Sequence, residues 1–95
     1  MRLKNKKAII TGGGAGIGRA ITERFCKEGA RVVIADRGSG EETSKQITGS
    51  VFHKTDISDK NSIQEMIHQA ISVLGGIDII VNNASALTTG SIETA

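Results

Sequence analysis

The sequence predicts an α/β fold built on a doubly wound parallel sheet, and three observations support this prediction. Short apolar runs alternate with stretches of helical periodicity, as in successive βαβ units. The first apolar run is hydrophobic on both faces, which is typical of a central parallel strand covered by helices on either side. A glycine cluster joins the first run to the first helix. We therefore expect the order βαβαβαβ, with the strands arranged 3-2-1-4 in one small domain.

The first βαβ unit is predicted over residues 7–36. Residues 7–11 form a short strand, and the helix that follows the glycine cluster runs to about Glu28, with Gly29 as its C-cap. Residues 31–36 form a second buried strand rich in β-branched side chains. The apolar residues of the helix follow helical spacing and should face the sheet: Ile17, Ala20, Ile21 and Phe25.

The second half of the chain predicts two more strands and two helices. Gly38 and Gly40 interrupt the next segment, so only a short, frayed helix over 41–47 is expected. Residues 50–55 alternate as an edge strand with one wetter face, and residues 77–82 form the fourth strand. Ser58 or Asp59 caps the longest helix, which Gly75 and Gly76 close. Its apolar stripe is predicted to be core and comprises Ile63, Met66, Ile67, Ala70, Ile71 and Leu74. The final dozen residues read as loop.

Composition narrows the classes of function. The chain has 95 residues, a net charge of +2 and one cysteine, Cys26, which we interpret as a packing residue in a reducing environment. The basic residues near the N-terminus flank a strand, and with two phenylalanines as the only aromatic residues they do not predict nucleic-acid binding. No apolar run is long enough to span a membrane, and no signal-type segment is present. We expect a cytoplasmic location and no membrane partner.

The glycine cluster predicts a phosphate site. Gly12 suits a sharp turn, Gly16 a close approach of the backbone to a phosphate, and Gly18 close packing of the helix on the strand. The free N–H groups at the helix N-terminus would then hold the pyrophosphate of a dinucleotide. The spacing differs from the common Gly-x-Gly-x-x-Gly, and a simple turn is the alternative, but the position between a strand and a helix favours the nucleotide site.

Asp36 predicts which dinucleotide is bound. It ends the second strand, 18 residues after Gly18, close to the interval of about 20 residues at which an acidic side chain reaches the adenine ribose. Its carboxylate would accept hydrogen bonds from the ribose hydroxyls and repel a 2′-phosphate, which predicts NAD over NADP. Arg37 works against this preference, because an arginine stacks on adenine or pairs with a 2′-phosphate. The alternative for Asp36 is a turn residue at the strand end.

Two motifs resemble those of the classical short-chain dehydrogenases/reductases. Residues Thr11–Gly18 are similar to the family's Thr-Gly-x-x-x-Gly-x-Gly turn, and residues Asn82–Ser85 are similar to its Asn-Asn-Ala-Gly motif, with serine in place of the glycine. The related extended class has a glycine at the position of Ala15, so this residue favours the classical class. The resemblance implies a Rossmann-type fold and hydride transfer between a nicotinamide cofactor and an alcohol or carbonyl substrate.

The resemblance also implies roles at the ends of the third and fourth strands. Asp56 would hydrogen-bond the adenine and Ile57 would lie along its ring, although a turn or capping role for Asp56 is the alternative. Asn82 and Asn83 would brace the sheet and line the ribose side of the cofactor, or else be two turn residues. The predicted cofactor-binding residues are Gly12, Gly16, Ile17, Gly18, Asp36, Arg37, Asp56, Ile57, Asn83 and Ala84.

Neither catalytic nor metal-binding residues are expected in this chain. His53 and His68 have no partner at metal-ligand spacing, and neither Ser85 nor Ser91 has a histidine at a sequence separation that would indicate a catalytic nucleophile. The family's catalytic Tyr-x-x-x-Lys pair follows the Asn-Asn-Ala-Gly strand, and this sequence contains no tyrosine. We interpret residues 1–95 as a single dinucleotide-binding domain, a partial Rossmann fold truncated before the catalytic half.

Two functions stay open on the sequence alone. The first is the NAD-binding portion of a short-chain oxidoreductase, which takes an alcohol or carbonyl substrate only with its catalytic half and forms a homo-oligomer. The second is a noncatalytic nucleotide-binding or assembly module, complete at 95 residues. The absence of proline and the helix-like approach at residues 91–95 favour the first. The fourth strand would then have an apolar edge prone to self-association.

Overall fold

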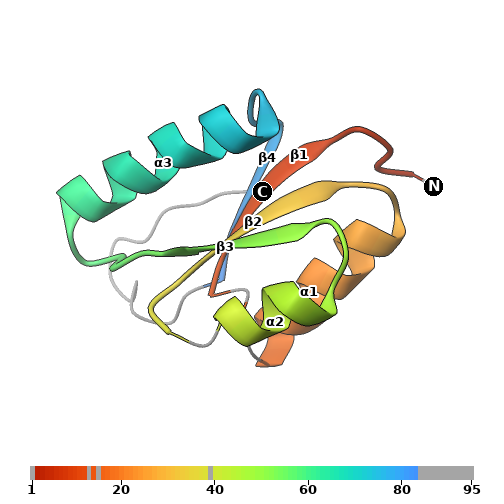
Figure 1. Cartoon of the computed structure of the whole chain (residues 1–95), viewed down its shortest axis with the longest axis horizontal. Coiled ribbons are helices and arrows are strands. Elements are labelled where there is room, and N and C mark those ends of the chain that lie inside the picture. Colours follow the sequence, from red (N-terminus) through yellow and green to blue (C-terminus); the bar gives the residue numbers. More distant parts are fainter. Residues whose placement is uncertain (1, 13, 15, 39, 84–95) are drawn as a thin grey trace.

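The computed structural model describes residues 2–12, 14, 16–38 and 40–83, and its strands form one parallel sheet in the order β3-β2-β1-β4. One face of the sheet carries α3, and the opposite face carries α1 and α2 (Figure 1). The predicted fold class and strand order are confirmed. The elements are β1 (Lys7–Thr11), α1 (Gly16–Lys27), β2 (Arg31–Asp36), α2 (Gly40–Gln46), β3 (Ser50–Lys54), α3 (Lys60–Leu74) and β4 (Ile79–Asn82).

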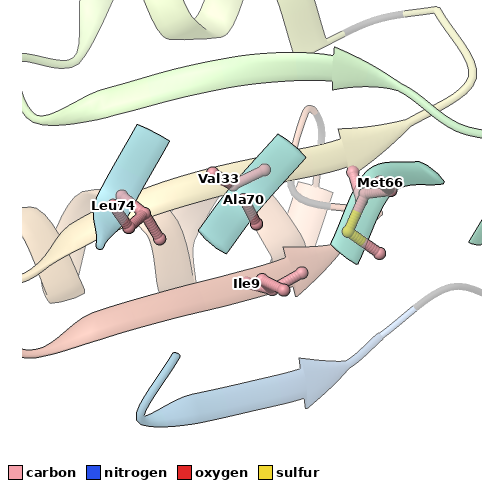
Figure 2. Close-up of a cluster of buried hydrophobic side chains, with 6 residues drawn as sticks. Ile9, Val33, Met66, Ala70 and Leu74 are labelled. Atoms are coloured by element: carbon pink, nitrogen blue, oxygen red, sulfur yellow. The ribbon is translucent and has the colours of Figure 1, made fainter. Parts of the chain in front are cut away.

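The face under α3 is a compact apolar cluster. Figure 2 shows the helix side chains Met66, Ala70 and Leu74 packed with Ile9 of β1 and Val33 of β2. The helix residues are four apart, so they line one side of α3. The prediction for Ile71 is wrong, because this side chain lies beside that line and is 48% exposed. The buried members of the cluster are Ile9, Val33, Ala35, Met66, Ala70 and Leu74.

α1 docks on the opposite face through a glycine. An added Cβ at Gly18 would overlap the carbonyl oxygen of Gly12, so only glycine allows the helix to approach the turn this closely. Thr22, one turn further on, is fully buried, and its hydroxyl donates to the Gly18 carbonyl at 2.9 Å. The packing role predicted for Gly18 is confirmed.

This docking corrects the predicted direction of two side chains. Ile17 and Ala20 were expected to face the sheet, but both are exposed, Ile17 at 72%. Because Gly18 lies against the turn, its neighbours on the helix are rotated away from the sheet. Ile21 and Phe25 do pack against the buried cluster on this face, as predicted.

α2 begins at Gly40, a residue that was expected to interrupt the segment. An added Cβ at Gly40 would meet the Phe52 ring and the Ile34 side chain, so glycine lets the helix lie close against β2 and β3. The longer α3 begins after its N-cap Asp59, one of the two predicted caps, whose side chain accepts from the Asn61 N–H. Among the described residues, no helix has the length and apolar character needed to cross a membrane.

β4 begins at Ile79, two residues later than predicted. The reason is that Asp78 bonds to Lys7 partly through its side chain rather than through its backbone alone. The Asp78 N–H donates to the Lys7 carbonyl at 2.7 Å, while the Asp78 carboxylate accepts from the Lys7 N–H at 2.9 Å. A side-chain oxygen therefore takes the place of a backbone carbonyl at this end of the ladder. β3 likewise ends one residue early, at Lys54, and Thr55 beyond it is buried.

Candidate functional site

The predicted site residues gather at the carboxyl edge of the sheet. Parallel strands all end at this edge, and ligands of doubly wound sheets bind there. The glycine turn, which joins β1 to α1 and contains Gly12, Gly14 and Gly16, follows β1. Asp36 ends β2, Asp56 follows β3 and Asn83 follows β4. Ala84 lies outside the described residues, as do Ala15 and the serines considered above as nucleophiles.

The Thr11 hydroxyl joins β1 to β4 at this edge. Its oxygen accepts from the Asn83 N–H at 2.9 Å, and its proton points toward Asn82 Oδ1 at 3.2 Å and the Val81 carbonyl at 3.3 Å. Asn83 Nδ2 donates to the Gly12 carbonyl at 3.3 Å. The asparagines brace the end of β4 against the glycine turn, as expected, whereas their contact with a ribose stays a prediction. We did not predict this role for Thr11, although a polar residue ending an apolar strand is a visible signal.

The glycine turn presents an open backbone surface. Gly12 and Gly16 have φ angles of 67° and 58°, in the left-handed region that favours glycine. An added Cβ at Gly16 would meet nothing within 4 Å, so the start of α1 is accessible on that side. The first turn of α1 contains no acidic residue, so its positive dipole end is not neutralised there. This combination suits an anion such as a phosphate.

The Asp36 carboxylate reaches from the end of β2 to the glycine turn. Its Oδ2 accepts from the Gly14 N–H at 3.1 Å, and its Oδ1 accepts from the Arg37 N–H at 2.6 Å. Two backbone donors on different segments therefore orient the carboxylate. A carboxylate accepts hydrogen bonds from hydroxyl groups as well as from N–H groups, which is the chemistry that a ribose would require.

An open pocket of about 360 Å³ lies beyond the ends of β2 and β3. Arg37 Nη2 lies 3.8 Å from Asp56 Oδ1, in an ion pair whose two side chains are both exposed. A pair this exposed contributes little to stability, so either side chain is available to a ligand at small cost. The residues that line the pocket are Arg37, Lys54, Thr55, Asp56 and Ser62.

Asp56 also has the turn role that was its alternative. Its Oδ1 accepts from the Ser58 hydroxyl at 2.6 Å and from the Ser58 N–H at 3.0 Å. These two hydrogen bonds, and then the nearby Arg37 charge, hold the pKa of the Asp56 carboxyl below its ordinary range. Ile57 between them is half-buried. Contact of Asp56 and Ile57 with an adenine stays a prediction.

Sequence reasoning also missed a residue of α2 that bonds to the glycine turn. Thr43 of α2 is 2% exposed, and its hydroxyl donates to the Gly14 carbonyl at 2.7 Å. Arg19 Nη1 donates to the same hydroxyl oxygen at 3.3 Å. A threonine within a short polar helix gives no signal in the sequence, because its burial depends on how α2 docks.

The two histidines and the cysteine do not line the pocket beside Asp56. His53 Nδ1 lies 3.1 Å from the Thr55 hydroxyl, and His68 is exposed on α3. Cys26 packs against the cluster under α1, and burial raises the pKa of its thiol. Within the described parts of the chain, no group of three or more His, Cys, Asp or Glu side chains is placed to hold a metal ion.

Comparison with known proteins agrees with this geometry. A family model described as short chain dehydrogenase matches residues 6–95. An uncharacterised oxidoreductase of Thermotoga maritima is 40% identical over 95% of this chain, and the match covers 38% of that relative. The NADP-dependent (R)-specific alcohol dehydrogenase of Lentilactobacillus kefiri is 39% identical over 97% of this chain and is likewise covered for 38% of its length. The chain thus spans less than two fifths of the length of these relatives.

Solved structures give the same result at the level of the fold. The 3-ketoacyl-(acyl-carrier-protein) reductase of Brucella melitensis, complexed with NADH, matches with a TM-score of 0.84 and 38% identity. The match covers 86% of this chain and 35% of that structure. A hydroxysteroid dehydrogenase of Escherichia coli also matches with a TM-score of 0.84 and 38% identity, over 87% of this chain and 38% of its own.

Proposed function

The chain belongs to the short-chain dehydrogenase family, and on this premise we propose that it binds NAD at the carboxyl edge of its sheet, as the cofactor-binding part of an oxidoreductase. One observation carries this proposal: the Asp36 carboxylate and the glycine turn are hydrogen-bonded to each other through the Gly14 N–H. The groups that would recognise a ribose and a pyrophosphate are therefore adjacent, as they are in a dinucleotide.

The residues present fit the cofactor. The open side of Gly16 leaves room for a phosphate against the backbone, and the N–H groups at the start of α1 would hold it. Asp36 would accept from the adenine ribose, and the pocket beside Asp56 would take the adenine. When bound, NAD supplies the nicotinamide carbon that accepts or gives up the hydride.

Asp36 supports NAD rather than NADP, because a 2′-phosphate would meet its negative charge. Arg37 works the other way: its exposed guanidinium pairs with Asp56 at 3.8 Å, and this weak pair would cost little to break in favour of a 2′-phosphate. Family membership does not decide the question, since the Lentilactobacillus relative is NADP-dependent by its name. The preference therefore depends on the local balance between Asp36 and Arg37.

The reaction we propose for the whole enzyme is hydride transfer between NAD and an alcohol or carbonyl substrate. Similarity to dehydrogenases and reductases over most of the chain favours this function over a noncatalytic module. Such a reaction also needs a positioned proton donor or acceptor, and the 95 residues contain no tyrosine to provide it. We infer a cytoplasmic location from the single cysteine, and a homo-oligomer as the assembled form.

Calorimetric titration of the purified protein with NADH tests the binding proposal. We expect saturable binding to one site, with ADP-ribose competing and adenosine, which lacks the pyrophosphate, competing far less. The absence of saturable binding would rule the proposal out. In a separate assay, the 95-residue chain should show no change in NADH absorbance with simple alcohols and ketones. Turnover by a chain whose mass confirms 95 residues would mean that another group supplies the proton.

A further inference from the structure

We propose that Thr43 is a positioning residue that holds the Gly14 peptide in the conformation required for dinucleotide binding. This inference rests on the proposed NAD site and names a residue of α2, outside the predicted set of cofactor contacts. It is a statement about how the glycine turn acquires its shape, because Thr43 would act through Gly14 rather than through the cofactor.

Gly14 is held by two side chains from different elements. Its N–H donates to Asp36 Oδ2 at 3.1 Å, and its carbonyl accepts from the Thr43 hydroxyl at 2.7 Å. Asp36 ends β2, whereas Thr43 lies in the middle of α2. The orientation of this part of the turn is therefore set from β2 and α2 together, in addition to the strand that precedes it.

Backbone contact between the turn and α2 makes the Thr43 bond possible. An added Cβ at Gly14 would lie 2.6 Å from the Gly40 nitrogen and 2.7 Å from its Cα, so the two glycines bring the segments together. Thr43 follows one helical turn after Gly40 and is 2% exposed. Water has little access to replace its hydroxyl as the donor to Gly14.

Arg19 gives the Thr43 hydroxyl its direction. Because Arg19 Nη1 donates to the hydroxyl oxygen at 3.3 Å, the hydroxyl proton is directed away from Arg19 and toward the Gly14 carbonyl. Gln46 Oε1 accepts from Arg19 Nη2 at 2.7 Å and holds the guanidinium in place. The chain of hydrogen bonds thus runs from the surface of α1 through α2 into the turn.

This arrangement links the two parts of the proposed cofactor site. Without the Thr43 bond, the Gly14 carbonyl loses its donor, and Gly14 is held from one side only. The carbonyl and the N–H belong to the two peptide groups that meet at the Gly14 Cα, so a shift of this Cα should also displace the N–H that orients Asp36. Recognition of the pyrophosphate and of the ribose should therefore weaken together, while the fold stays intact. A residue with only a packing role would lower stability without this selective effect.

The test compares NADH affinity in three variants of the purified protein. Thr43→Val keeps the shape of the side chain but removes the hydroxyl, and we expect NADH to bind about tenfold more weakly. Thr43→Ser retains the hydroxyl and should bind within about threefold of the unmutated protein. Ser44→Ala is the matched control, because the Ser44 hydroxyl donates only to the Glu41 carbonyl of its own helix and its loss should leave affinity unchanged.

Two further measurements separate the possible failures. If the unmutated protein does not bind NADH, the proposed function is wrong; if it binds and folded Thr43→Val binds equally well, the role of Thr43 is wrong. If Thr43→Val does not fold, the NADH affinity of Arg19→Met is measured instead, in about 1 M salt. At this ionic strength charges are screened beyond about 3 Å, so the lost Arg19 charge itself should not alter the attraction of the cofactor. We expect roughly threefold weaker binding there, and unchanged affinity would overturn the inference. The Gly14 amide resonance should shift in the variants that weaken binding and not in Ser44→Ala.

Discussion

The two ends of the sheet are held together by different means. At the amino end, the Asp78 carboxylate bonds to the first residue of β1 and extends the backbone ladder. At the carboxyl end, side chains from several elements bond to the glycine turn: Asp36, Thr43 and Asn83. The contrast indicates that polar residues at the amino end complete the sheet, whereas those at the carboxyl end give shape to a loop. Paired substitutions at the two ends can test this distinction.

The largest effect should come from closing the contact between α1 and the turn. Gly18→Ala places a Cβ against the Gly12 carbonyl, where neither backbone can give way, and should lower the free energy of unfolding by about 3 kcal/mol. Gly38→Ala is the control at the same edge, because an added Cβ there meets nothing within 4 Å, and it should change stability by less than about 0.5 kcal/mol. Chemical denaturation measures both. Similar stabilities would mean that the close approach of α1 is dispensable.

A comparison of two glycines with left-handed backbone conformation should separate the effect of backbone strain on stability from the effect on ligand binding. Gly16 at the carboxyl end has a φ of 58°, and Gly75 at the C-cap of α3 has a φ of 87°, so alanine should cost about 1 kcal/mol of stability at either position. Only Gly16→Ala should also weaken NADH binding, by about a hundredfold, because its Cβ occupies the proposed phosphate position. Calorimetric titration of the two variants checks this. Equal affinities would place the pyrophosphate elsewhere.

Two aspartates, one at each end of the sheet, should differ in their effect on cofactor choice. The unmutated protein should prefer NADH over NADPH by about 1 to 3 kcal/mol, because the 2′-phosphate meets the Asp36 carboxylate. Asp36→Asn should narrow this gap, while Asp78→Asn, which removes the carboxylate beside Lys7, should leave it unchanged. Competition titrations with both cofactors provide the comparison. Equal affinities in the unmutated protein would shift the choice to Arg37.

The smallest effect concerns acid stability and a carboxylate on the amino side. The Arg2 N–H donates to Glu28 Oε1 at 2.9 Å, and this bond, with the Arg24 charge, holds the pKa of the Glu28 carboxyl below its ordinary range. A carboxyl whose pKa is lowered by folding stabilises the native state above its unfolded pKa, and this contribution disappears as the pH falls through the folded value. Glu28→Gln should therefore flatten the loss of stability between about pH 5 and pH 3. Thermal melts over that range measure the slope, and a slope identical to that of the unmutated protein would contradict the assignment.

The parts that the sequence predicted well are those that depend on local pattern. β1 and β2 have the bounds predicted from their apolar runs and the polar residues that flank them. Asp36 lies at the carboxyl edge because all strands of a parallel sheet end at the same edge. The glycine turn was found in the same way, since its residues need φ values that other side chains avoid. Local rules were sufficient for these elements because burial on both faces leaves little choice of register.

The parts of the structure that the sequence did not predict depend on how helices dock on the sheet. Ile17 and Ile71 have helical spacing like their buried neighbours, yet the angle at which each helix meets the sheet leaves them exposed. Thr43 shows the converse, since a polar residue becomes buried once two glycines bring α2 against the turn. Periodicity identifies a helix face only approximately, and the contact that selects the buried line is made by residues far away in the sequence.

The pairing of β1 with both of its neighbours also has a consequence for how the chain folds. Lys7 pairs with Arg31 of β2 after one helix, but Ala8 pairs with Ile79 of β4 only after three helices and two strands. The second loop is about three times longer than the first, so closing it costs about 1 kcal/mol more in chain entropy. We therefore expect β1, α1 and β2 to assemble first, leaving one edge of the central strand unpaired until β4 arrives. During synthesis this edge would be exposed for several seconds, at about 5 to 20 residues per second. The interval in which a nascent chain is most open to pairing with another copy thus ends only when β4 has docked.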